Sequence, residues 1–244
     1  MVGADGWDSL SQLFYVLNNT IQYVVLRNYE LLPDSFDPSI HGDIDLLVEN
    51  LNKIVYLANA RKKFPENPSN VAYYVPICND EIQFDFRFLG DNYMDKRWEM
   101  EVLQSAREFV LDSHPMGIMI MSPLHQYYTL LYHAYVQKIK IAPDYPAKLQ
   151  TFATAIGATY KEDVEYSMCQ LLGFMKEFDY HISIPSEWEG TLNWKNIKYS
   201  DEYRGVRVRY ILHPGIWRTI RSIYAWGLKA LNKVRMVLHI QIKQ

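Results

Sequence analysis

Three aspartates, Asp43, Asp45 and Asp85, are the residues of this sequence best suited to do chemistry. Residues two apart on an extended strand point to the same face, so Asp43 and Asp45 project together, about 7 Å apart along the strand. Apolar and polar residues alternate in the segment EIQFDFRFL, which places Asp85 on the polar face of another strand. Carboxylate oxygens suit Mg²⁺ or Mn²⁺, which take the rest of their ligands from water and substrate phosphates. The sequence therefore predicts a divalent-metal site that acts on a phosphoryl group.

The competing interpretation is that these aspartates are ordinary surface residues. An Asp-x-Asp pair by itself is frequent, and most such pairs are solvated residues in loops or at strand ends. Two observations favour a site: short apolar strands carry the aspartates, and these strands are close together in the chain. Three like charges held near one another would repel strongly without a cation. The metal site is therefore predicted on one condition, that the strands are neighbours in the fold.

Hydrophobic spacing predicts an α/β unit around the aspartates. In the first part of the chain we expect a helix at 7–19, a strand at 21–26, a loop at 27–42, a strand at 43–48, a helix at 49–64, and strands at 71–78 and 81–89. The last two strands are expected to form a hairpin whose turn contains Asn79 and Asp80.

The second half of the chain has mainly helical spacing. Residues 117–121 predict either a further strand or the entry to a helix, and Ser122-Pro123 is a good helix start, with a capping residue before a proline at the first position. Helical spacing continues to about residue 180. The expected fold class is α/β (α+β), a small mixed sheet flanked by helices and followed by a mostly helical C-terminal region. The expected domains are a catalytic core at 1–121, a helical domain at 122–203 and a tail at 204–244.

The segments IQYVVLRNYELLP, HGDIDLLV and IQFDFRF together resemble the nucleotidyltransferase-fold superfamily, whose members pair a D-x-D strand with a third carboxylate on a later strand. The resemblance covers roughly residues 12 to 140 and is specific in the acidic triad. It implies that Asp43 and Asp45 are metal ligands, and that Asp85 is a further ligand or the general base for the incoming hydroxyl. The arrangement is also similar to small proteins of bacterial surface-polysaccharide gene clusters and, more distantly, to the phosphocholine and ribitol-phosphate transferases of the fukutin-like group. Those transferases move a phospho-substituent from a CDP-linked donor onto a glycan.

The sequence departs from the superfamily at the turn after the first strand. Most members have Gly-Gly or Gly-Ser there, where backbone amides hold the nucleotide phosphates, but this chain has Arg27-Asn28-Tyr29. Arg27 and Asn28 are therefore candidate substrate-binding residues, since a guanidinium binds phosphate through paired hydrogen bonds. The missing glycine turn is also the main support for a non-catalytic interpretation.

Three further residues are candidates for substrate binding, each with a simpler alternative. Arg87 lies on the same strand face as Asp85, so it either binds a substrate anion or forms an ion pair that keeps the carboxylate ionised. Lys138 follows the helix that begins at Ser122, and it either contacts a donor phosphate or complements the charge of the helix end. His133 lies on that helix, where a hydrogen-bonded, partly buried histidine is the commoner case.

These observations predict an enzyme, a magnesium-dependent nucleotidyl- or phosphosubstituent transferase with Asp43, Asp45 and Asp85 as catalytic and metal-binding residues. From the resemblance, the expected donor is a nucleoside triphosphate or a CDP-linked compound, and the acceptor is a glycan or glycolipid in cell-surface polysaccharide assembly. Two alternatives stay open. One is a non-catalytic module that binds a nucleotide or recruits partners at a membrane. The other is an antitoxin-like nucleotidyltransferase that modifies a partner protein.

The C-terminal tail differs in charge from the rest of the chain. The net charge is −3, yet nine Lys or Arg and no Asp or Glu lie between Arg204 and Gln244. Apolar residues from Ile216 on have the spacing of an amphipathic helix, with basic residues beside the apolar stripe. Such a helix can bind an anionic membrane surface or pack on the acidic body or another copy, and nucleic acid is the least favoured partner. It carries too many charges to span a bilayer.

Cysteine usage and the N-terminal segment bear on location. Cys78 and Cys169 are far apart and form no CxxC motif, so neither a disulfide framework nor a zinc site is predicted, and both are expected to be small buried residues. The N-terminal segment lacks a basic region followed by an uninterrupted apolar run, so no secretory signal is expected. We expect a cytoplasmic protein, which would lie at the inner face of the plasma membrane if the tail binds lipid.

Overall fold

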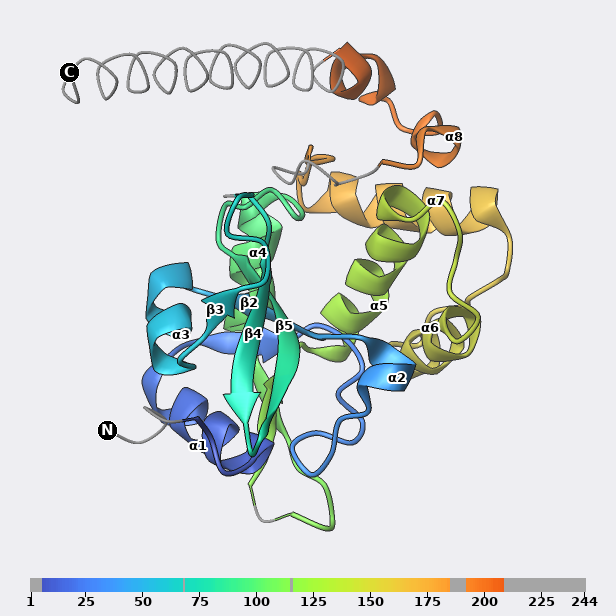
Figure 1. Ribbon diagram of the computed structural model, residues 1–244. Coiled ribbons are helices and arrows are strands. Elements are labelled where there is room, and N and C mark those ends of the chain that lie inside the picture. Colours follow the sequence, from blue (N-terminus) through green and yellow to red (C-terminus); the bar gives the residue numbers. More distant parts are fainter. Residues whose placement is uncertain (1–5, 68, 115, 185–191, 209–244) are drawn as a thin grey trace, which may run out of the picture. The chain divides into compact units, whose positions relative to one another are not determined.

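Short runs of β-branched and aromatic residues form the strands of a central sheet in the computed structural model, which describes residues 6–67, 69–114, 116–184 and 192–208 (Figure 1). The strands are β1 (Tyr23–Val25), β2 (Ile44–Val48), β3 (Arg61–Lys62), β4 (Ala72–Ile77), β5 (Asp80–Phe88), β6 (Arg107–Phe109) and β7 (Ile118–Ile120). The helices are α1 (Leu10–Thr20), α2 (Pro38–His41), α3 (Leu51–Leu57), α4 (Lys96–Gln104), α5 (Pro123–Leu131), the π-helix η1 (Tyr132–Gln137), α6 (Tyr145–Ala155), α7 (Val164–Glu177) and α8 (Trp194–Ile197).

The chain divides into two units, residues 1–201 and residues 202–244. The first unit contains the sheet and the helices from α1 to α8. The domain boundaries expected after residues 121 and 203 stay predictions.

The sheet is mixed, with the strand order β3-β4-β5-β2-β1-β7-β6 among the described residues. Strand β2 pairs antiparallel with β1 and parallel with β5, while β4 and β5 form an antiparallel hairpin. Figure 1 shows α1 and α3 on one side of this sheet and α5, α6 and α7 on the other. The predicted fold class, a mixed sheet flanked by helices and followed by helical segments, is confirmed.

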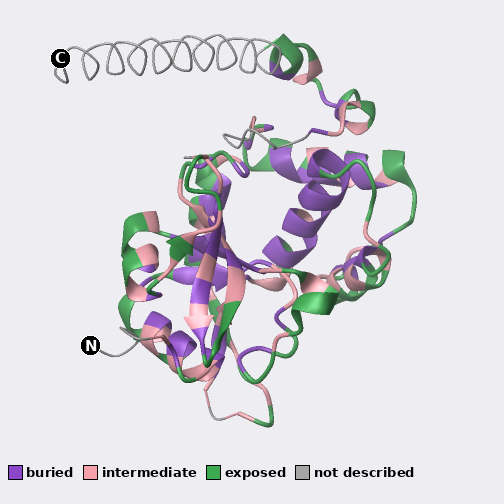
Figure 2. Ribbon diagram, in the orientation of Figure 1, coloured by how far each residue is buried: buried purple, intermediate pink, exposed green. Residues whose placement is uncertain are grey.

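The core on the α1 and α3 side follows from the hydrophobic spacing of the sequence. Leu13 and Leu17 of α1 are fully buried, and they belong to the same cluster as Ile54 of α3. The alternation along β5 turns Phe84 and Phe86 into this cluster, which leaves the polar residues of the strand for the opposite face. Figure 2 shows buried residues along the central strands and α5. The sheet therefore packs on a hydrophobic core on the side opposite the face that carries the aspartates.

Helix α4 packs against β1 and β2, and Trp98 is its buried anchor. The Trp98 ring stacks on Tyr180 with ring centroids 5.3 Å apart, and its indole N–H donates to His125 Nδ1 at 3.2 Å. The sequence leaves open whether Trp98 lies in the core or in a substrate-facing loop. Because its side chain has no exposed surface and its N–H is satisfied, Trp98 is a core residue.

Helix α3 is shorter than the sequence predicts. The predicted helix at 49–64 ends at Leu57 because Asn59 adopts a left-handed conformation with φ 51°, after which Arg61 and Lys62 pair with β4. The predicted hairpin turn is also displaced by one residue. Asp80 is already paired with Ile77, so the turn consists of residues 78 and 79.

Other expectations for the elements have mixed outcomes. Ser122 caps α5 by accepting a hydrogen bond from the His125 N–H, as predicted, and residues 118–120 form a strand rather than the entry to that helix. The spacing alone did not predict α2, α4 or β6. The expectation that both cysteines are buried is wrong, because Cys78 and Cys169 are exposed. Cys78 has a φ of 57° in the β4–β5 turn, a position that turns its side chain away from the core.

The prediction of an amphipathic membrane-binding tail at 204–244 lies mostly outside the described residues, which end at residue 208. No helix among the residues that the structure describes is long and apolar enough to cross a membrane.

Candidate functional site

Two of the predicted aspartates are direct neighbours in the sheet. The parallel pairing of β2 with β5 places Asp45 opposite Asp85, and adjacent strands lie about 4.8 Å apart. Their neighbours Ile44, Leu46, Phe84 and Phe86 face the buried core, so the two carboxylates project from the opposite face. Asp43 lies immediately before β2. The condition set by the sequence, that the aspartate-bearing strands are neighbours, is therefore met.

Asp43 interacts electrostatically with the carboxylates of Asp45 and Asp85. Burial raises the pKa of Asp43 to about 7, and the charges of Asp45 and Asp85 act in the same direction. The charges of Arg27 and Lys138 lower the pKa of Asp43 and only partly offset the rise. Carboxylates repel one another over such short distances because each disfavours the ionised form of the next. At neutral pH Asp43 is therefore about half protonated, and a bound cation would favour its ionised form.

Arg27 is held inside the site by Asp45. Its Nη2 lies 2.5 Å from Asp45 Oδ1, and its Nη1 donates to the Tyr93 hydroxyl at 2.6 Å. Burial alone would lower the pKa of Arg27, but the Asp45 carboxylate and the nearby Tyr93 raise it well above its usual value. The guanidinium therefore stays charged, and its first role in the structure is to neutralise Asp45.

Gln83 forms hydrogen bonds with the carboxylates of both Asp43 and Asp85. Its Nε2 donates to Asp43 Oδ2 at 3.4 Å and to Asp85 Oδ1 at 3.3 Å, while Lys63 Nζ donates to its Oε1 at 2.5 Å. The Lys63 contact fixes which end of the amide faces the carboxylates, because only an oxygen can accept from an ammonium. Gln83 thus keeps Asp43 and Asp85 turned toward each other.

A buried cluster behind Arg27 fixes Tyr93. His133 Nδ1 lies 3.0 Å from the Tyr93 hydroxyl and 2.8 Å from Gln137 Oε1, and Gln137 Nε2 donates to the Tyr93 carbonyl at 2.6 Å. Burial and the charge of Arg27 lower the pKa of His133 well below its usual value, so the ring is neutral at pH 7. His133 and Gln137 both come from the π-helix η1, a type of helix that is frequent at functional sites.

Asn28 takes a backbone conformation that glycine favours. Its φ is 55°, in the left-handed region, where asparagine is enriched among residues other than glycine. Its Oδ1 accepts a hydrogen bond from Lys148 Nζ at 2.6 Å. The turn after β1 therefore has a backbone shape typical of glycine, and the Asn28 side chain links it to Lys148.

The remaining predicted substrate-binding residues lie at the edge of the site. Arg87 Nη1 is 3.6 Å from Asp91 Oδ2, and its guanidinium lies 4.6 Å from the centre of the Tyr93 ring. Lys138 is an exposed residue at the end of η1, and its charge acts on Asp43. The structure thus brings Arg27, Lys138 and the aspartates together, while it places His133 inside the protein.

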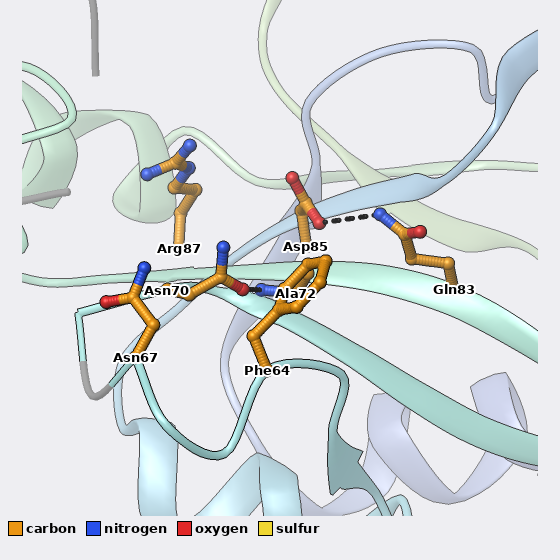
Figure 3. A pocket seen from close by; sticks show the side chains of 7 residues that line it. All are labelled: Phe64, Asn67, Asn70, Ala72, Gln83, Asp85 and Arg87. Carbon is orange, nitrogen blue, oxygen red and sulfur yellow. Dashed lines mark hydrogen bonds between the residues drawn. The ribbon is translucent and has the colours of Figure 1, made fainter. Parts of the chain in front are cut away.

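A cavity of about 230 Å³ opens beside Asp85 (Figure 3). It is lined by Phe64, Asn67, Asn70, Ala72, Gln83, Asp85 and Arg87. The side chains of Gln83, Asp85 and Arg87 come from the polar face of β5, and the others come from the segment that leads from β3 into β4. The cavity therefore places the Asp85 carboxylate beside the polar side chains of Asn67, Asn70, Gln83 and Arg87.

The donor chemistry fits a hard divalent cation, since Asp43, Asp45 and Asp85 offer oxygen ligands alone. Among the described residues, with their side chains placed as they are in the structure, no group of three or more His, Cys, Asp or Glu is arranged to hold a metal ion. One reason is that Asp45 forms an ion pair with Arg27, with 2.5 Å between Arg27 Nη2 and Asp45 Oδ1. A cation bound by all three carboxylates would have to share Asp45 with Arg27 or displace it.

Several residues of the site were not identified from the sequence. The alternation along β5 places Gln83 on the same face as Asp85, but it does not show that Gln83 bonds to the carboxylates. Tyr93 lies in a loop, and only the fold brings it to Arg27. Asn67 and Asn70 have no periodic signal, because their positions depend on the segment between β3 and β4.

Glu99 of α4 braces the loop that carries Tyr93. Its Oε2 accepts from the Gly90 N–H at 2.7 Å and its Oε1 from the Met94 N–H at 3.2 Å. Glu99 is fully buried, and burial, together with the charge of Asp91, raises its pKa to about 8. A carboxyl group with a raised pKa in the folded state stabilises the protein most at low pH, where both states are protonated.

The stability of the protein should therefore fall as the pH rises from about 4.5 to about 8, because the unfolded chain ionises Glu99 first. Glu99→Gln should make this fall shallower, on the order of 2–4 kcal/mol between pH 5 and pH 8.5, as the pKa difference implies. Urea unfolding of both proteins at the two pH values measures the effect. Glu49→Gln, on the exposed surface, is the matched control, and an equal change in both variants would contradict the expectation.

Comparisons with known proteins give a distant structural likeness. No protein-family model matches the sequence, and no curated protein matches it. Among solved structures, the chain is similar to an antigenic nucleotidyltransferase-like protein from Paracoccidioides brasiliensis, with 13% identity and a TM-score of 0.36. The match covers 73% of this chain and 92% of that protein's chain.

Proposed function

We propose that this chain is a metal-dependent transferase of phosphorus-containing groups, of the nucleotidyltransferase-like class, that acts in cell-surface polysaccharide or glycolipid assembly. The observation that supports it most is the register of the β2–β5 pair, which sets Asp45 directly opposite Asp85. The charges of Asp45 and Asp85 both act on Asp43, which supports Asp43 as the third carboxylate of the site. Three oxygen ligands from neighbouring strands suit Mg²⁺ or Mn²⁺ and phosphoryl chemistry.

The residues have distinct roles in this proposal. Asp43, Asp45 and Asp85 would hold Mg²⁺, which supplies positive charge for the oxygens of the transferred phosphoryl group when it is bound. Asp85, which lines the cavity, accepts the proton of the acceptor hydroxyl. Arg27 and Lys138 provide positive charge for the phosphates of a nucleoside triphosphate or a CDP-linked donor. The acceptor is a glycan or glycolipid, and the basic tail at 204–244 would hold the protein at an anionic membrane surface.

Metal binding should raise the thermal stability of the protein. A cation at about 100 times its Kd stabilises a folded protein by about 2.7 kcal/mol, which corresponds to a rise in Tm of roughly 5–10 °C for a chain of this size. Thermal unfolding with EDTA, with Mg²⁺ and with Mn²⁺ measures this rise. The Asp45→Asn/Asp85→Asn double variant should lose the rise, while Asp80→Asn, an exposed residue at the start of β5, should keep it. No metal-dependent rise in the wild-type protein would contradict the proposal.

The Arg27–Asp45 ion pair favours a second function, a nucleotide-binding module without catalysis. In that case Arg27 replaces the metal as the partner of Asp45, and the site binds a nucleotide without a divalent ion. Turnover assays with a panel of nucleoside triphosphates and CDP-linked donors, combined with binding assays in EDTA, separate the two. Binding in EDTA without turnover of any donor supports the module, whereas turnover that requires Mg²⁺ supports the enzyme.

A further inference from the structure

The cavity beside Asp85 has two chemically different ends. Figure 3 shows the side chains of Asn67, Asn70 and Arg87 toward one end and Gln83 toward the other, with Asp85 between them. Asp85 and Arg87 are two residues apart on β5, so they lie about 7 Å apart along the strand. A ligand that spans the cavity therefore meets a carboxylate and a cationic region at this separation.

A backbone hydrogen bond fixes the orientation of the Asn70 amide. Asn70 Oδ1 accepts from the Ala72 N–H at 2.8 Å, and only an oxygen can accept there, so Asn70 presents its NH₂ group to the cavity. The Asn67 amide has the same orientation in the structure, with Oδ1 accepting from the Ser69 hydroxyl at 2.9 Å. Figure 3 shows both amide nitrogens on the side where Arg87 and Asp85 lie.

The Arg87 end of the cavity is therefore rich in hydrogen-bond donors, and it contains a guanidinium that is paired with Asp91. The Arg87 guanidinium is positioned by Asp91 and by the Tyr93 ring, and its side chain has only 12% of its surface exposed. Guanidinium and amide N–H groups that converge in a partly buried place bind the oxygens of a phosphate better than any uncharged group. This end is thus suited to a phosphate.

The other features of the cavity suit a small polyhydroxylated skeleton. The Asp85 carboxylate is an acceptor that a ligand hydroxyl can donate to, and Phe64, which is 40% exposed, offers the face of a ring to carbon atoms. A skeleton of five or six carbons covers the distance of about 7 Å between Asp85 and Arg87. The volume of about 230 Å³ limits the ligand to one such unit.

We propose that this cavity is the acceptor subsite, and that it takes a phosphorylated sugar or polyol unit of the glycan or glycolipid acceptor, with its phosphate at Asn67, Asn70 and Arg87 and a hydroxyl at Asp85. The proposal rests on the transferase function and names the class of its acceptor. In the transfer, the acceptor oxygen forms a new bond to a phosphorus of the donor, and Asp85 takes the hydroxyl proton. The bond from that phosphorus to the leaving group breaks, and the leaving group is pyrophosphate for a nucleoside triphosphate and CMP for a CDP-linked donor. The acceptor's own phosphate remains unchanged and serves only for binding.

The test uses calorimetric titration of the full chain in EDTA, so that it does not depend on the metal. The probes are ribose 5-phosphate and glucose 6-phosphate, the same sugars without phosphate, and inorganic phosphate. Asn70→Asp keeps an oxygen for the Ala72 N–H but replaces the cavity-facing NH₂ with a negatively charged oxygen. It should weaken binding of the sugar phosphate by about 10- to 100-fold, the range for losing a hydrogen bond to a charged group.

Asn50→Asp is the matched control. Asn50 Oδ1 also accepts a backbone N–H, from Lys53, and the substitution changes the charge by the same amount on an exposed residue outside the cavity. Its affinity for the sugar phosphate should equal that of the wild-type protein.

Each other outcome has a clear meaning. No binding of either sugar phosphate, unchanged binding in Asn70→Asp, or equally tight binding of inorganic phosphate alone overturns the proposal. Sugar-phosphate binding that Asn70→Asp abolishes, in a protein that turns over no donor, supports the subsite and counts against the transferase function. The two proposals can therefore fail separately.

Discussion

The Asp85→Asn variant should turn over its donor and acceptor at least about 10²-fold, and up to about 10⁴-fold, more slowly than the wild-type protein. Asparagine has the size of aspartate, but it neither accepts the proton of the attacking hydroxyl nor supplies negative charge to a cation. Asp85 is only partly buried and lies on the polar face of β5, so the fold should remain intact. Initial rates with Mg²⁺ and the donors that the wild-type protein uses provide the measurement.

Asp43→Asn should reduce turnover in the same way but with an opposite effect on stability. The raised pKa of Asp43, about 7, shows that its ionised form is disfavoured in the folded protein. Removing this charge should therefore stabilise the metal-free protein at pH 8, which is the usual sign of a residue retained for function. Asp80→Asn, an exposed residue at the start of β5, is the control for activity and stability. Full activity in both Asp43→Asn and Asp85→Asn would refute the transferase.

The faces of the strands could be predicted from the sequence, whereas their pairing could not. Alternation along β5 places Phe84 and Phe86 in the core and Asp85 on the opposite face, and this pattern is local. The parallel pairing of β2 with β5 joins segments about forty residues apart, and the chain between them forms α3, β3 and β4. No local pattern indicates such a register, because it depends on how the whole sheet assembles. The resemblance stated from the sequence implies that the three aspartates share one site, but it does not give this register.

The side-chain contacts of the site were less predictable still. The sequence predicts that Arg27 faces substrate phosphates, but it does not show that the guanidinium also pairs with Asp45 and bonds to Tyr93. A buried carboxylate requires a partner, but the sequence does not show which of the nearby cations supplies it. In the same way, the helical spacing of 49–64 could not show that Asn59 would turn the chain into β3. Such decisions depend on tertiary contacts rather than on local propensity.

Arg27→Met should be the most destabilising single substitution in the site. Asp45 is only 4% exposed, and its carboxylate lies 2.5 Å from the Arg27 guanidinium. Removing the cation leaves a buried charge without its partner, which typically costs about 3–5 kcal/mol. That is a large part of the roughly 5–15 kcal/mol that stabilises a typical folded domain. Urea unfolding at pH 7.5 in EDTA measures the loss.

Arg61→Met is the matched control, because Arg61 forms an ion pair with Glu81 on the exposed surface. Exposed pairs contribute little because water screens them, so this variant should be close to the wild-type protein. The Arg27→Met/Asp45→Asn double variant should regain part of the stability that Arg27→Met loses, since the buried charge is then absent as well. An Arg27→Met loss no larger than that of Arg61→Met would show that Asp45 does not depend on Arg27.

The same variant tests how Arg27 and a cation share Asp45. If both compete for the carboxylate, Mg²⁺ should stabilise Arg27→Met more than it stabilises the wild-type protein, because the metal no longer has to displace a guanidinium. If Arg27 instead replaces the metal, Mg²⁺ should stabilise neither protein, and Asp45 would then be a structural anchor for Arg27. The difference between the two increments in Tm therefore decides whether the ion pair is the resting form of a metal site or its substitute.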